Sequence, residues 1–502
     1  MMLRQPDHEI VVVGAGFSGI GASIKLQEAG FDDHVLLEEG DGVGGTWHWN
    51  TYPGIGVDIP SYSYQFSFEQ RGDWSRVYAH GHELKAYAEH CADRYDVRRR
   101  VRFGTRVAAA RFDEDAELWI LTTTTGEELA ARFVIGATGV LTQPKRPDVP
   151  GLDAFAGTTM HTARWDHDVD LRGARVGIIG TGASAVQVIP SIAEEVEHLT
   201  VFQRTPIWCL PRPDGPVPAP VRAALSRVPG AKALARLAAQ AFVEATFPIP
   251  AHFDGIVKVG RGAEALGRAW LRSQVHDPAT RAALTPAYGV GCKRPSFSNT
   301  YLATFNRDDV TLETSPIERV TPSGVRCAGG RHDLDVLLLA TGFQVMEATN
   351  MPPFRLTGRG DVELAAWWGE HRMQAYQGVS VPGFPNYFAV LGPYAYNGAS
   401  YFTLIENQVR HIVRCLRRAR DTAATTVEVT AEANERYFRE MLGRRDRQIF
   451  FQPSCAGANS YYFDEHGDVP FRSALTLESA WRSARFDLAD YRFSAPAGAA
   501  AP

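Results

Sequence analysis

Two glycine-rich turns contain the residue types from which nucleotide-binding sites are built. The first follows the apolar run EIVVV and the second follows RVGII, and their small residues are Gly14, Gly16 and Gly19, then Gly180, Gly182 and Ala185. In such a turn one glycine permits the tight bend, the next lets the backbone approach a pyrophosphate, and the third position allows close helix–strand packing. Each turn therefore predicts a dinucleotide site, although a strand–turn–helix unit without a ligand shares the pattern.

The residue that lies 24 positions beyond each turn distinguishes the two sites. Glu38 stands 24 positions after Gly14, and Arg204 stands 24 positions after Gly180, followed by Thr205. A glutamate accepts hydrogen bonds from a ribose diol, whereas an arginine favours a negatively charged 2′-phosphate. The simplest assignment is FAD in the first site and NADPH in the second, and a surface arginine is the plain alternative for Arg204.

Further candidate cofactor-binding residues surround the turns. The helices after the turns open with Phe17 and Ser18, and with Ala183 and Ser184. The segment GVGGTWHWN (42–50) adds Gly45, Thr46 and Trp47. Small residues beside aromatic planes suit a flat cofactor, and tryptophans stacked in a core are the alternative. Phosphates at both sites are expected at the N-terminus of the helix that each turn opens.

The elements that position these residues repeat along the chain. Residues 9–30 and 174–196 both indicate a short buried strand, a turn and a helix, and each is followed by a second strand, HVLLEE or HLTVFQR. FVIGATG (133–139) and DVLLLATGF (335–343) form a second matching pair. This order predicts an α/β fold with two Rossmann-like dinucleotide-binding domains, one inserted in the other.

A different composition separates the halves of the second domain. The proline-rich PRPDGPVPAP (211–220) leads into residues 213–290, which continue with stretches such as AKALARLAAQAFVEA that have helical periodicity. We expect a helical excursion that covers a cleft. A helix lying on a membrane surface is the alternative, and it is less favoured because the polar face is not strongly basic.

Composition limits the other function classes. A net charge of −5 gives no electrostatic case for nucleic acid or anionic membranes. The six cysteines, at positions 91, 209, 292, 327, 415 and 455, contain no CxxC and no metal-ligand spacing. They indicate reduced thiols in a cytosolic protein, no metal site and no dithiol reductase. The N-terminus does not have the pattern of a signal peptide, and no apolar run is long enough for a membrane helix. We expect a cytoplasmic protein.

The stretch FAGTTMHTARWD (155–166) lies between the two glycine turns. It spaces Phe155, Gly157, His161 and Trp165 at offsets of two, six and ten, with Asp166 next. Taken alone, this pattern fits a satisfied core histidine and two buried rings. Its position between two glycine-rich nucleotide turns indicates instead that it is a family fingerprint.

FxGxxxHxxxW followed by Asp or Pro resembles the fingerprint of type I Baeyer–Villiger monooxygenases. N-hydroxylating and flavin-containing monooxygenases have a similar motif that usually closes with Tyr or Phe, so Trp165 favours the Baeyer–Villiger family. The resemblance covers about residues 8–465 and includes GGTWHWNTYPGIGVD (44–58), CKRP (292–295), FNRDDV (305–310) and DVLLLATGF (335–343).

The resemblance implies roles for individual residues. Glu38 is similar to the ribose ligand of FAD, and Arg204, Thr205 and Lys293 to the residues that face the NADPH 2′-phosphate. Arg294 resembles the mobile active-site arginine and Asp58 the carboxylate that orients it, although a structural ion pair is the alternative. His161 and Trp165 resemble linker residues that couple NADPH binding to domain movement. One departure is the trio Ile55, Gly56 and Val57 before Asp58, which affects the expected wall of the substrate pocket.

The same resemblance implies a domain order, with the NADP domain inserted in the FAD domain. The expected FAD-binding parts are 1–148 and 344–502, the latter with a C-terminal tail. The expected NADP-binding parts are 149–212 and 291–343, and 213–290 form the helical insertion.

The implied activity is an FAD-containing, NADPH- and O₂-dependent Baeyer–Villiger oxidation of a ketone to an ester or lactone through a C4a-peroxyflavin. A guanidinium suits this chemistry because it cannot deprotonate and favours nearby anions. One alternative is a flavin monooxygenase that oxygenates N or S, and a further one is an NADPH flavoprotein reductase without oxygenation. The sequence does not identify the ketone or the oligomeric state.

Overall fold

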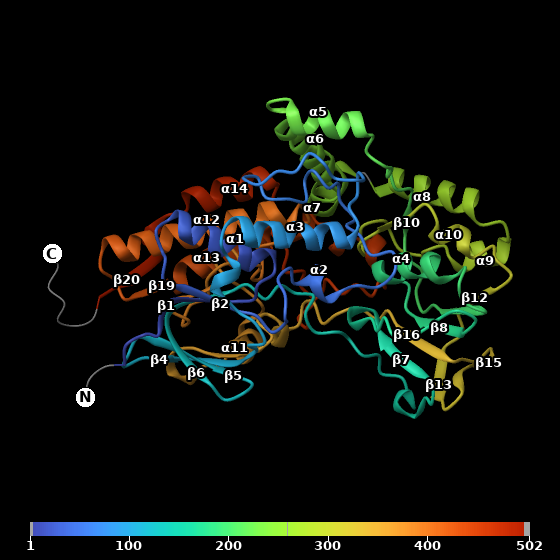
Figure 1. Ribbon diagram of the computed structural model, residues 1–502, viewed down its shortest axis with the longest axis horizontal. Helices are drawn as coiled ribbons and strands as arrows, with labels where there is room; N and C mark the ends of the chain where they lie inside the picture. The colour runs from blue at the N-terminus through green and yellow to red at the C-terminus, as the bar shows by residue number, and fades with distance from the viewer. Residues whose placement is uncertain (1–3, 259, 496–502) are drawn as a thin grey trace.

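The computed structural model describes residues 4–258 and 260–495, and its two largest sheets lie side by side (Figure 1). The first sheet has the strand order β17-β4-β5-β6-β1-β2-β3, with β18 paired to β6. Its strands are β1 (His8–Val13), β2 (His34–Leu37), β3 (Val101–Arg102), β4 (Val107–Asp113), β5 (Leu118–Thr123), β6 (Glu128–Gly136), β17 (Arg355–Thr357) and β18 (Tyr387–Ala389). The expected tail from residue 496 onward lies outside the described residues.

Strand β1 is at the centre of the first sheet because its apolar run can be covered on both faces. Its last four residues are all buried, as expected for a parallel strand between layers of helices. It pairs in parallel with β2 and β6, and Val13 is in register with Leu37 and Gly136. The turn after β1 and the end of β2 therefore lie at the same edge of the sheet.

Helices α1 (Phe17–Glu28), α3 (Gly81–Arg94) and α12 (Tyr401–Asp421) lie over this sheet (Figure 1). Buried residues recur along α12 at intervals of three and four, at Phe402, Ile405, Val409, Ile412, Leu416 and Ala419, so one face of the helix is apolar. A Cβ on Gly21 of α1 would lie 2.9 Å from Ile405. Glycine at this position therefore allows α1 and α12 to pack closely.

The second sheet is entirely parallel, with the order β12-β9-β8-β16-β7. Its strands are β7 (Thr158–His161), β8 (Arg175–Ile179), β9 (His198–Phe202), β12 (Val310–Glu313) and β16 (Val336–Leu339). Ile179 is in register with Phe202, so the turn after β8 and the residues after β9 share one edge. These strands all fall between β6 and β17 in sequence, and the predicted fold, one Rossmann-like unit inserted in another, is confirmed.

The excursion between the halves of the second unit is helical. It contains α5 (Ala219–Arg227), α6 (Ala231–Thr246), α7 (Pro248–Val257), α8 (Gly260–Gln274) and α9 (Pro278–Ala283), and α5 and α6 project at the top of Figure 1. Within residues 4–258 and 260–495, no helix is long and apolar enough to cross a membrane.

The remaining elements connect these layers. The short strands are β10 (Cys209–Leu210), β11 (Ser296–Phe297), β13 (Ile317–Thr321), β14 (Gly324–Cys327), β15 (Gly330–Asp333), β19 (Thr426–Val429) and β20 (Tyr491–Ser494). The other helices are α2 (Thr46–Trp49), α4 (Ala183–Ile192), α10 (Tyr301–Thr304), α11 (Leu364–His371), α13 (Ala431–Gly443) and α14 (Thr476–Arg485).

Candidate active site

Two glycines of the first turn have no room for a side chain. Gly14 has φ +107°, and a Cβ there would lie 2.8 Å from the carbonyl oxygen of Ala137. A Cβ on Gly19 would lie 1.9 Å from the carbonyl oxygen of Gly14. Gly16 is the N-cap of α1, and no side chain caps that helix. The backbone N–H groups at the start of α1 are therefore available to a phosphate.

The residues expected around the first turn lie beside it. Glu38 is buried, and its carboxylate accepts hydrogen bonds from the N–H groups of Ala15 (2.7 Å) and Gly40 (2.8 Å). A Cβ on Gly45 would lie 3.0 Å from the Cα of Gly16, so the segment that begins α2 with Thr46 and Trp47 packs directly on the turn. A carboxylate, free helix N–H groups and a small-residue cradle fit the ribose and pyrophosphate of FAD.

The second turn has the same construction. Gly180 has φ +114°, and a Cβ there would lie 2.4 Å from the carbonyl oxygen of Ala340. Gly182 is the N-cap of α4, which begins with Ala183 and Ser184, and no side chain caps this helix. A Cβ on Gly182 would meet nothing within 4 Å, so this side of the turn is open. The Thr181 hydroxyl donates to the carbonyl of Thr205 (3.0 Å) and joins the turn to the end of β9.

Lys293 lies near Arg204, which follows the end of strand β9 in the second sheet. Burial of Lys293 and its proximity to Arg204 lower the pKa of the lysine to about 8. Arg204 is exposed, and among the described residues no carboxylate contributes to the pKa shift of Lys293. Two neighbouring positive charges form a site for an anion such as a 2′-phosphate.

Arg294, the residue after Lys293, forms a two-pronged ion pair with Asp58. Its Nε donates to Oδ2 at 2.6 Å and its Nη2 to Oδ1 at 2.7 Å. Burial alone would raise the pKa of Asp58, but Arg294 outweighs it and the pKa is lowered. Burial likewise disfavours the charged arginine, and the neighbouring carboxylate raises the pKa of Arg294 well above its usual value. Both groups are therefore charged over the whole physiological pH range.

The turn before Asp58 is packed against α4. Tyr52 donates to the side-chain oxygen of Gln187 (3.0 Å), and the side-chain nitrogen of Gln187 donates to the carbonyl of Gly56 (3.0 Å). A Cβ on Gly54 would lie 2.6 Å from the Gln187 carbonyl oxygen. Ile55 packs against the apolar cores of both units, and Val57 is buried. Ile55, Gly56 and Val57 therefore lie where the two units contact each other.

Aromatic side chains surround Arg294, and they were not predicted from the sequence. Tyr396 accepts from Nη1 of Arg294 at 3.3 Å, and the guanidinium lies 5.8 Å from the ring centroid of Phe247. Tyr462 is buried and influences the pKa of Arg294. Phe247 belongs to the helical excursion, and Tyr396 lies 102 residues from Arg294. The aromatic pairs YAY (394–396) and YY (461–462) were the only sequence pattern that could have pointed to them.

The fingerprint segment lies at the contact between the units. A Cβ on Gly157 would lie 2.3 Å from the carbonyl oxygen of Asp335 and 2.7 Å from the Phe155 ring, which explains the glycine. His161 ends β7, its Nδ1 accepts from the N–H of Ala163 (3.0 Å), and its Nε2 is buried without a partner among the described residues. Burial lowers the pKa of His161. Trp165 is half-buried against the core of the second unit.

Two contacts next to the fingerprint reach the first unit. Arg164 lies over the ring of Trp49, 4.2 Å from its centroid, and the His167 imidazole is 2.9 Å from the Thr51 hydroxyl. Trp49 and Thr51 belong to the segment that follows the Gly45 cradle. The fingerprint thus lies between the second sheet and the segment that packs on the first glycine turn.

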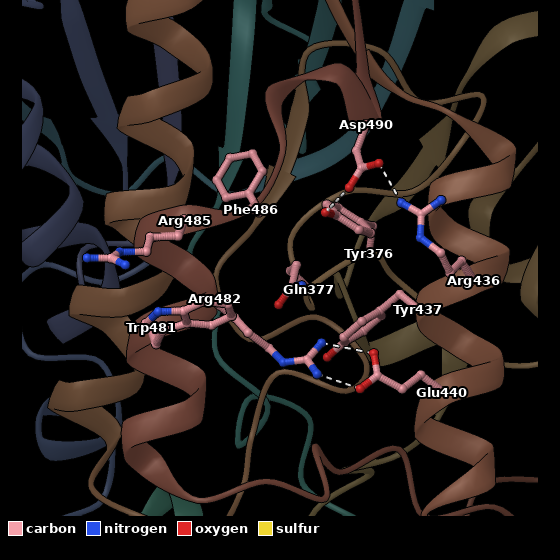
Figure 2. A pocket seen from close by; sticks show the side chains of 10 residues that line it. All are labelled: Tyr376, Gln377, Arg436, Tyr437, Glu440, Trp481, Arg482, Arg485, Phe486 and Asp490. Carbon is pink, nitrogen blue, oxygen red and sulfur yellow. Dashed lines mark hydrogen bonds and ion pairs between the residues drawn. The ribbon is translucent and has the colours of Figure 1, made fainter.

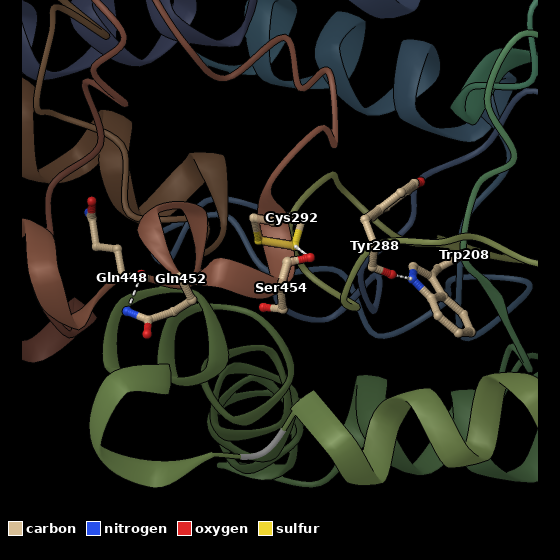
Figure 3. The surroundings of a disulfide bond; sticks show 7 residues. Trp208, Tyr288, Cys292, Gln448, Gln452 and Ser454 are labelled. Carbon is tan, nitrogen blue, oxygen red and sulfur yellow. Dashed lines mark hydrogen bonds between the residues drawn. A yellow bond between two sulfur atoms is a disulfide. The ribbon is translucent and has the colours of Figure 1, made fainter.

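The expectation of six reduced thiols is wrong for one pair. Cys292 and Cys455 form a disulfide (Figure 3), and the other four cysteines are buried and free. Sequence spacing could not predict this pair because the partners are 163 residues apart. The bond ties the residue before Lys293 to the segment that follows Phe451.

A cavity of about 290 Å³ lies elsewhere, between α13 and α14 (Figure 2). Two ion pairs line it: Arg436 with Asp490, and Arg482 with Glu440. It contains none of the residues predicted from the sequence. The charged groups of these two pairs neutralise each other within the cavity. We therefore place the candidate active site at the two glycine turns and Arg294, and not at this cavity.

Comparison with known proteins gives the family. Residues 11–215 match the family described as pyridine nucleotide-disulphide oxidoreductase. A Baeyer–Villiger monooxygenase of Streptomyces coelicolor is 36% identical, over 98% of this chain and 93% of the relative. The chain belongs to the Baeyer–Villiger monooxygenase family. A Baeyer–Villiger monooxygenase of Pseudomonas aeruginosa is 33% identical, over 90% of this chain and 85% of the relative.

Solved structures agree with this membership. A steroid monooxygenase bound to NADP has a TM-score of 0.87 at 31% identity, covering 98% of this chain and 100% of that one. A cyclohexanone monooxygenase from Rhodococcus sp. Phi1 bound to NADP⁺ has a TM-score of 0.84 at 31% identity, covering 97% and 99%. The predicted class, an NADPH-dependent flavoprotein monooxygenase of the Baeyer–Villiger type with FAD and NADPH as cofactors, is confirmed.

Proposed function

We propose that this Baeyer–Villiger monooxygenase converts a ketone into an ester or lactone at the site around Arg294, using NADPH and O₂. The observation that carries the proposal is the paired contact between Arg294 and Asp58. Lys293, the preceding residue, lies near Arg204 beside the second glycine turn, whereas Asp58 follows the segment that packs on the first turn. A fixed positive charge thus lies between residues that belong to the two nucleotide sites.

Each cofactor has a defined set of residues. We propose that Gly14, Gly16, Phe17, Ser18, Gly19, Glu38, Gly45, Thr46, Trp47 and Asp58 hold FAD. NADPH is held by Gly180, Gly182, Ala183, Ser184, Arg204, Thr205 and Lys293. When bound, the flavin supplies acceptance of the hydride and activation of O₂. The cradle around Gly16 and Gly45 and the neighbouring cations at the second site support this division.

The chain's own contribution to the reaction is electrostatic. Arg294 remains charged at every working pH, and its remaining guanidinium hydrogens can bind negative charge that develops on a reacting oxygen. Asp58 holds the planar group in one orientation and balances its charge when water is excluded. Tyr396 and Phe247 limit the space around the guanidinium and form part of the wall against which a ketone lies.

The fingerprint residues Phe155, Gly157, His161 and Trp165 have a positioning role in this proposal. Their segment contacts the second sheet and, through Arg164 and His167, the first unit. Movement of one unit relative to the other therefore changes the surroundings of this segment. We assign it to the coupling of NADPH binding to domain movement.

The positions of the strands and helices support a division of the chain into two interleaved nucleotide-binding domains and a helical insertion. We propose FAD-binding parts at 1–148 and 344–502, NADP-binding parts at 149–212 and 291–343, and a helical insertion at 213–290. The strands of the second sheet fall within 158–339, and helices α5 to α9 fall within 219–283. We also propose a cytoplasmic location, because NADPH is supplied there. The Cys292–Cys455 disulfide is an observation against that location, because disulfides are rare in reducing compartments. Cell fractionation tests the location.

A substrate panel tests the proposal. The purified holoenzyme, checked for bound flavin by its absorbance, is supplied with NADPH and with cyclic, linear, aryl and terpenoid ketones. A tertiary amine and a thioether are assayed beside them. We expect an ester or lactone in amounts equal to the NADPH consumed. Formation of N- or S-oxides with no ester from any ketone would contradict the proposal.

A further inference from the structure

Three side chains of different chemistry converge at the outer edge of the second sheet. Glu313 ends the edge strand β12, and Cys327 and His332 belong to the hairpin formed by β14 and β15. The ligand atoms of the three, a carboxylate oxygen, the thiol sulfur and an imidazole nitrogen, all lie within 4.8 Å of one another.

The strand register explains the convergence. Val325 pairs with His332, and Cys327 pairs with Gly330, in antiparallel register. Because side chains alternate along a strand, Cys327 and His332 project from the same face of the hairpin as diagonal neighbours. Glu313 approaches that face from the neighbouring sheet, and its Oε2 lies 2.9 Å from Nε2 of His332.

The three residues are not a solvated surface group. Cys327 is only 3% exposed, and the side chains of Glu313 and His332 are 13% and 20% exposed. The imidazole packs edge-on against Phe202, with ring centroids 5.4 Å apart. The second carboxylate oxygen of Glu313 accepts from the N–H of Ser315 at 2.7 Å. Such an outer contact orients a carboxylate in the way that the outer shell of a metal site does.

We propose that Glu313, Cys327 and His332 bind a Zn²⁺-like divalent cation. A sulfur, a nitrogen and an oxygen ligand are the set that zinc prefers, and three protein ligands leave one tetrahedral position for water. Mg²⁺ and Ca²⁺ prefer oxygen ligands alone and do not fit. One thiolate and one carboxylate balance the two positive charges of the cation. The spacings of 14 and 5 residues do not match any cysteine-based motif, so the sequence did not predict the site.

The place of the cluster gives the cation a structural role. Glu313 is in parallel register with Phe202, and Arg204 follows two residues later. The Gln203 N–H also donates to the Glu313 carbonyl (2.8 Å). A cation here fixes the hairpin to the strand end that carries Arg204, and so restricts the backbone at the 2′-phosphate site.

Cobalt binding to the holoenzyme tests this site, since tetrahedral Co²⁺ absorbs at longer wavelengths than the oxidised flavin. The enzyme is treated with a chelator, dialysed and titrated with Co²⁺. We expect one equivalent to bind with intense tetrahedral bands, and Zn²⁺ to displace it. Zn²⁺ should also raise the melting temperature by preferential binding to the folded state.

Matched variants identify the ligands. Cys327→Ser and His332→Ala should each weaken Zn²⁺ binding by more than about 100-fold. Loss of a residue that only hydrogen-bonds to a metal ligand weakens metal binding by at most about 100-fold, so a larger loss identifies a direct ligand. Cys209→Ser is the control, because Cys209 is also buried and free but does not belong to the cluster, and it should bind as the wild type does. If Cys327→Ser does not fold, His332→Ala decides in its place. Absence of bound metal in the wild type by mass spectrometry after dialysis against Zn²⁺, or equal binding by wild type and His332→Ala, would overturn the proposal.

Discussion

Arg294 and Asp58 are 236 residues apart in sequence, and yet two donors of the guanidinium meet both carboxylate oxygens at 2.6 and 2.7 Å. The contact joins the segment that packs on the first glycine turn to the loop that faces the second. Its geometry fixes the plane of the guanidinium and leaves Nη1 directed to Tyr396. Removal of either partner leaves the other charge without its counterion, so the two substitutions should have related effects.

Arg294→Ala should bind FAD and oxidise NADPH but release hydrogen peroxide in place of ester. Loss of one preorganised donor to a developing oxyanion costs about 2.7–4 kcal/mol, or roughly a hundred- to a thousandfold in rate. Asp58→Ala should show a milder defect, because it orients the arginine. Product, peroxide and NADPH are quantified in the same assay. Ester formation by Arg294→Ala at the wild-type rate would leave the arginine only a structural role.

Lys293 should give NADPH use a pH dependence that NADH use lacks. The lysine is charged below its pKa of about 8 and loses the charge as the pH rises above that value. The attraction for a 2′-phosphate is therefore present below about pH 8 and lost above it. We expect kcat/KM for NADPH to fall in that range, while kcat/KM for NADH does not fall in parallel. The difference should vanish in Lys293→Met, and its persistence there would assign the pH dependence to another group.

Arg204→Ala should raise the KM for NADPH and hardly alter that for NADH. A hydrogen bond to a charged group contributes about 1.5–3 kcal/mol, or roughly ten- to a hundredfold in affinity. Arg175 provides a matched control, since it is paired with Asp335 on the same sheet and its replacement should not change coenzyme preference. Equal losses with both coenzymes in Arg204→Ala would indicate a folding defect.

His161→Ala should slow coupled turnover and leave FAD content unchanged. Burial lowers the pKa of His161, so the imidazole is neutral at pH 7 and accepts a hydrogen bond from Ala163. Loss of that bond, worth about 1 kcal/mol, should reduce the rate about fivefold. The pH profile of kcat/KM should keep its shape. If one limb of the profile disappears in the variant, His161 exchanges a proton in the reaction.

Thiol counting tests the disulfide. The protein denatured without reductant should react with a thiol reagent at four cysteines, and at six after reduction, because Cys292 and Cys455 are bonded and four are free. Peptide mass mapping should recover the two as one cross-linked species. Six reactive thiols in freshly purified, unreduced protein would contradict the pairing.

Local patterns predicted those parts of the site that repeat at fixed spacing. Gly14 and Glu38, like Gly180 and Arg204, lie at the ends of adjacent parallel strands, and a strand–turn–helix–strand unit sets their separation. The strand register therefore places each pair at one edge without any long-range information. The family resemblance predicted the pairing of Asp58 with Arg294. The spacing of residues along the chain could not predict it, because the two are 236 positions apart.

The surroundings of Arg294 depend on tertiary packing, which sequence periodicity does not record. Phe247 reaches the arginine because α6 and α7 meet at that residue, and Tyr396 reaches it from the loop before α12. The pairing of Cys292 with Cys455 likewise depends on the segment after Phe451 packing on the 288–292 loop, where Gly289 N–H donates to the Ser454 carbonyl (2.9 Å). Each contact joins parts of the chain whose local composition is unremarkable.

The bond between Cys292 and Cys455 closes a covalent ring whose ends are 163 residues apart. That ring contains β12 and β16 of the second sheet as well as β17, β18 and α12 of the first. In the unfolded chain, a loop of this size loses conformational entropy worth about 5 kcal/mol in the chain-entropy account. In the folded enzyme, the loop that carries Lys293 and Arg294 is covalently linked to the C-terminal part of the chain through this disulfide. Because Cys292 lies two residues before Arg294, this covalent link limits how far the arginine can move away from the C-terminal part of the chain.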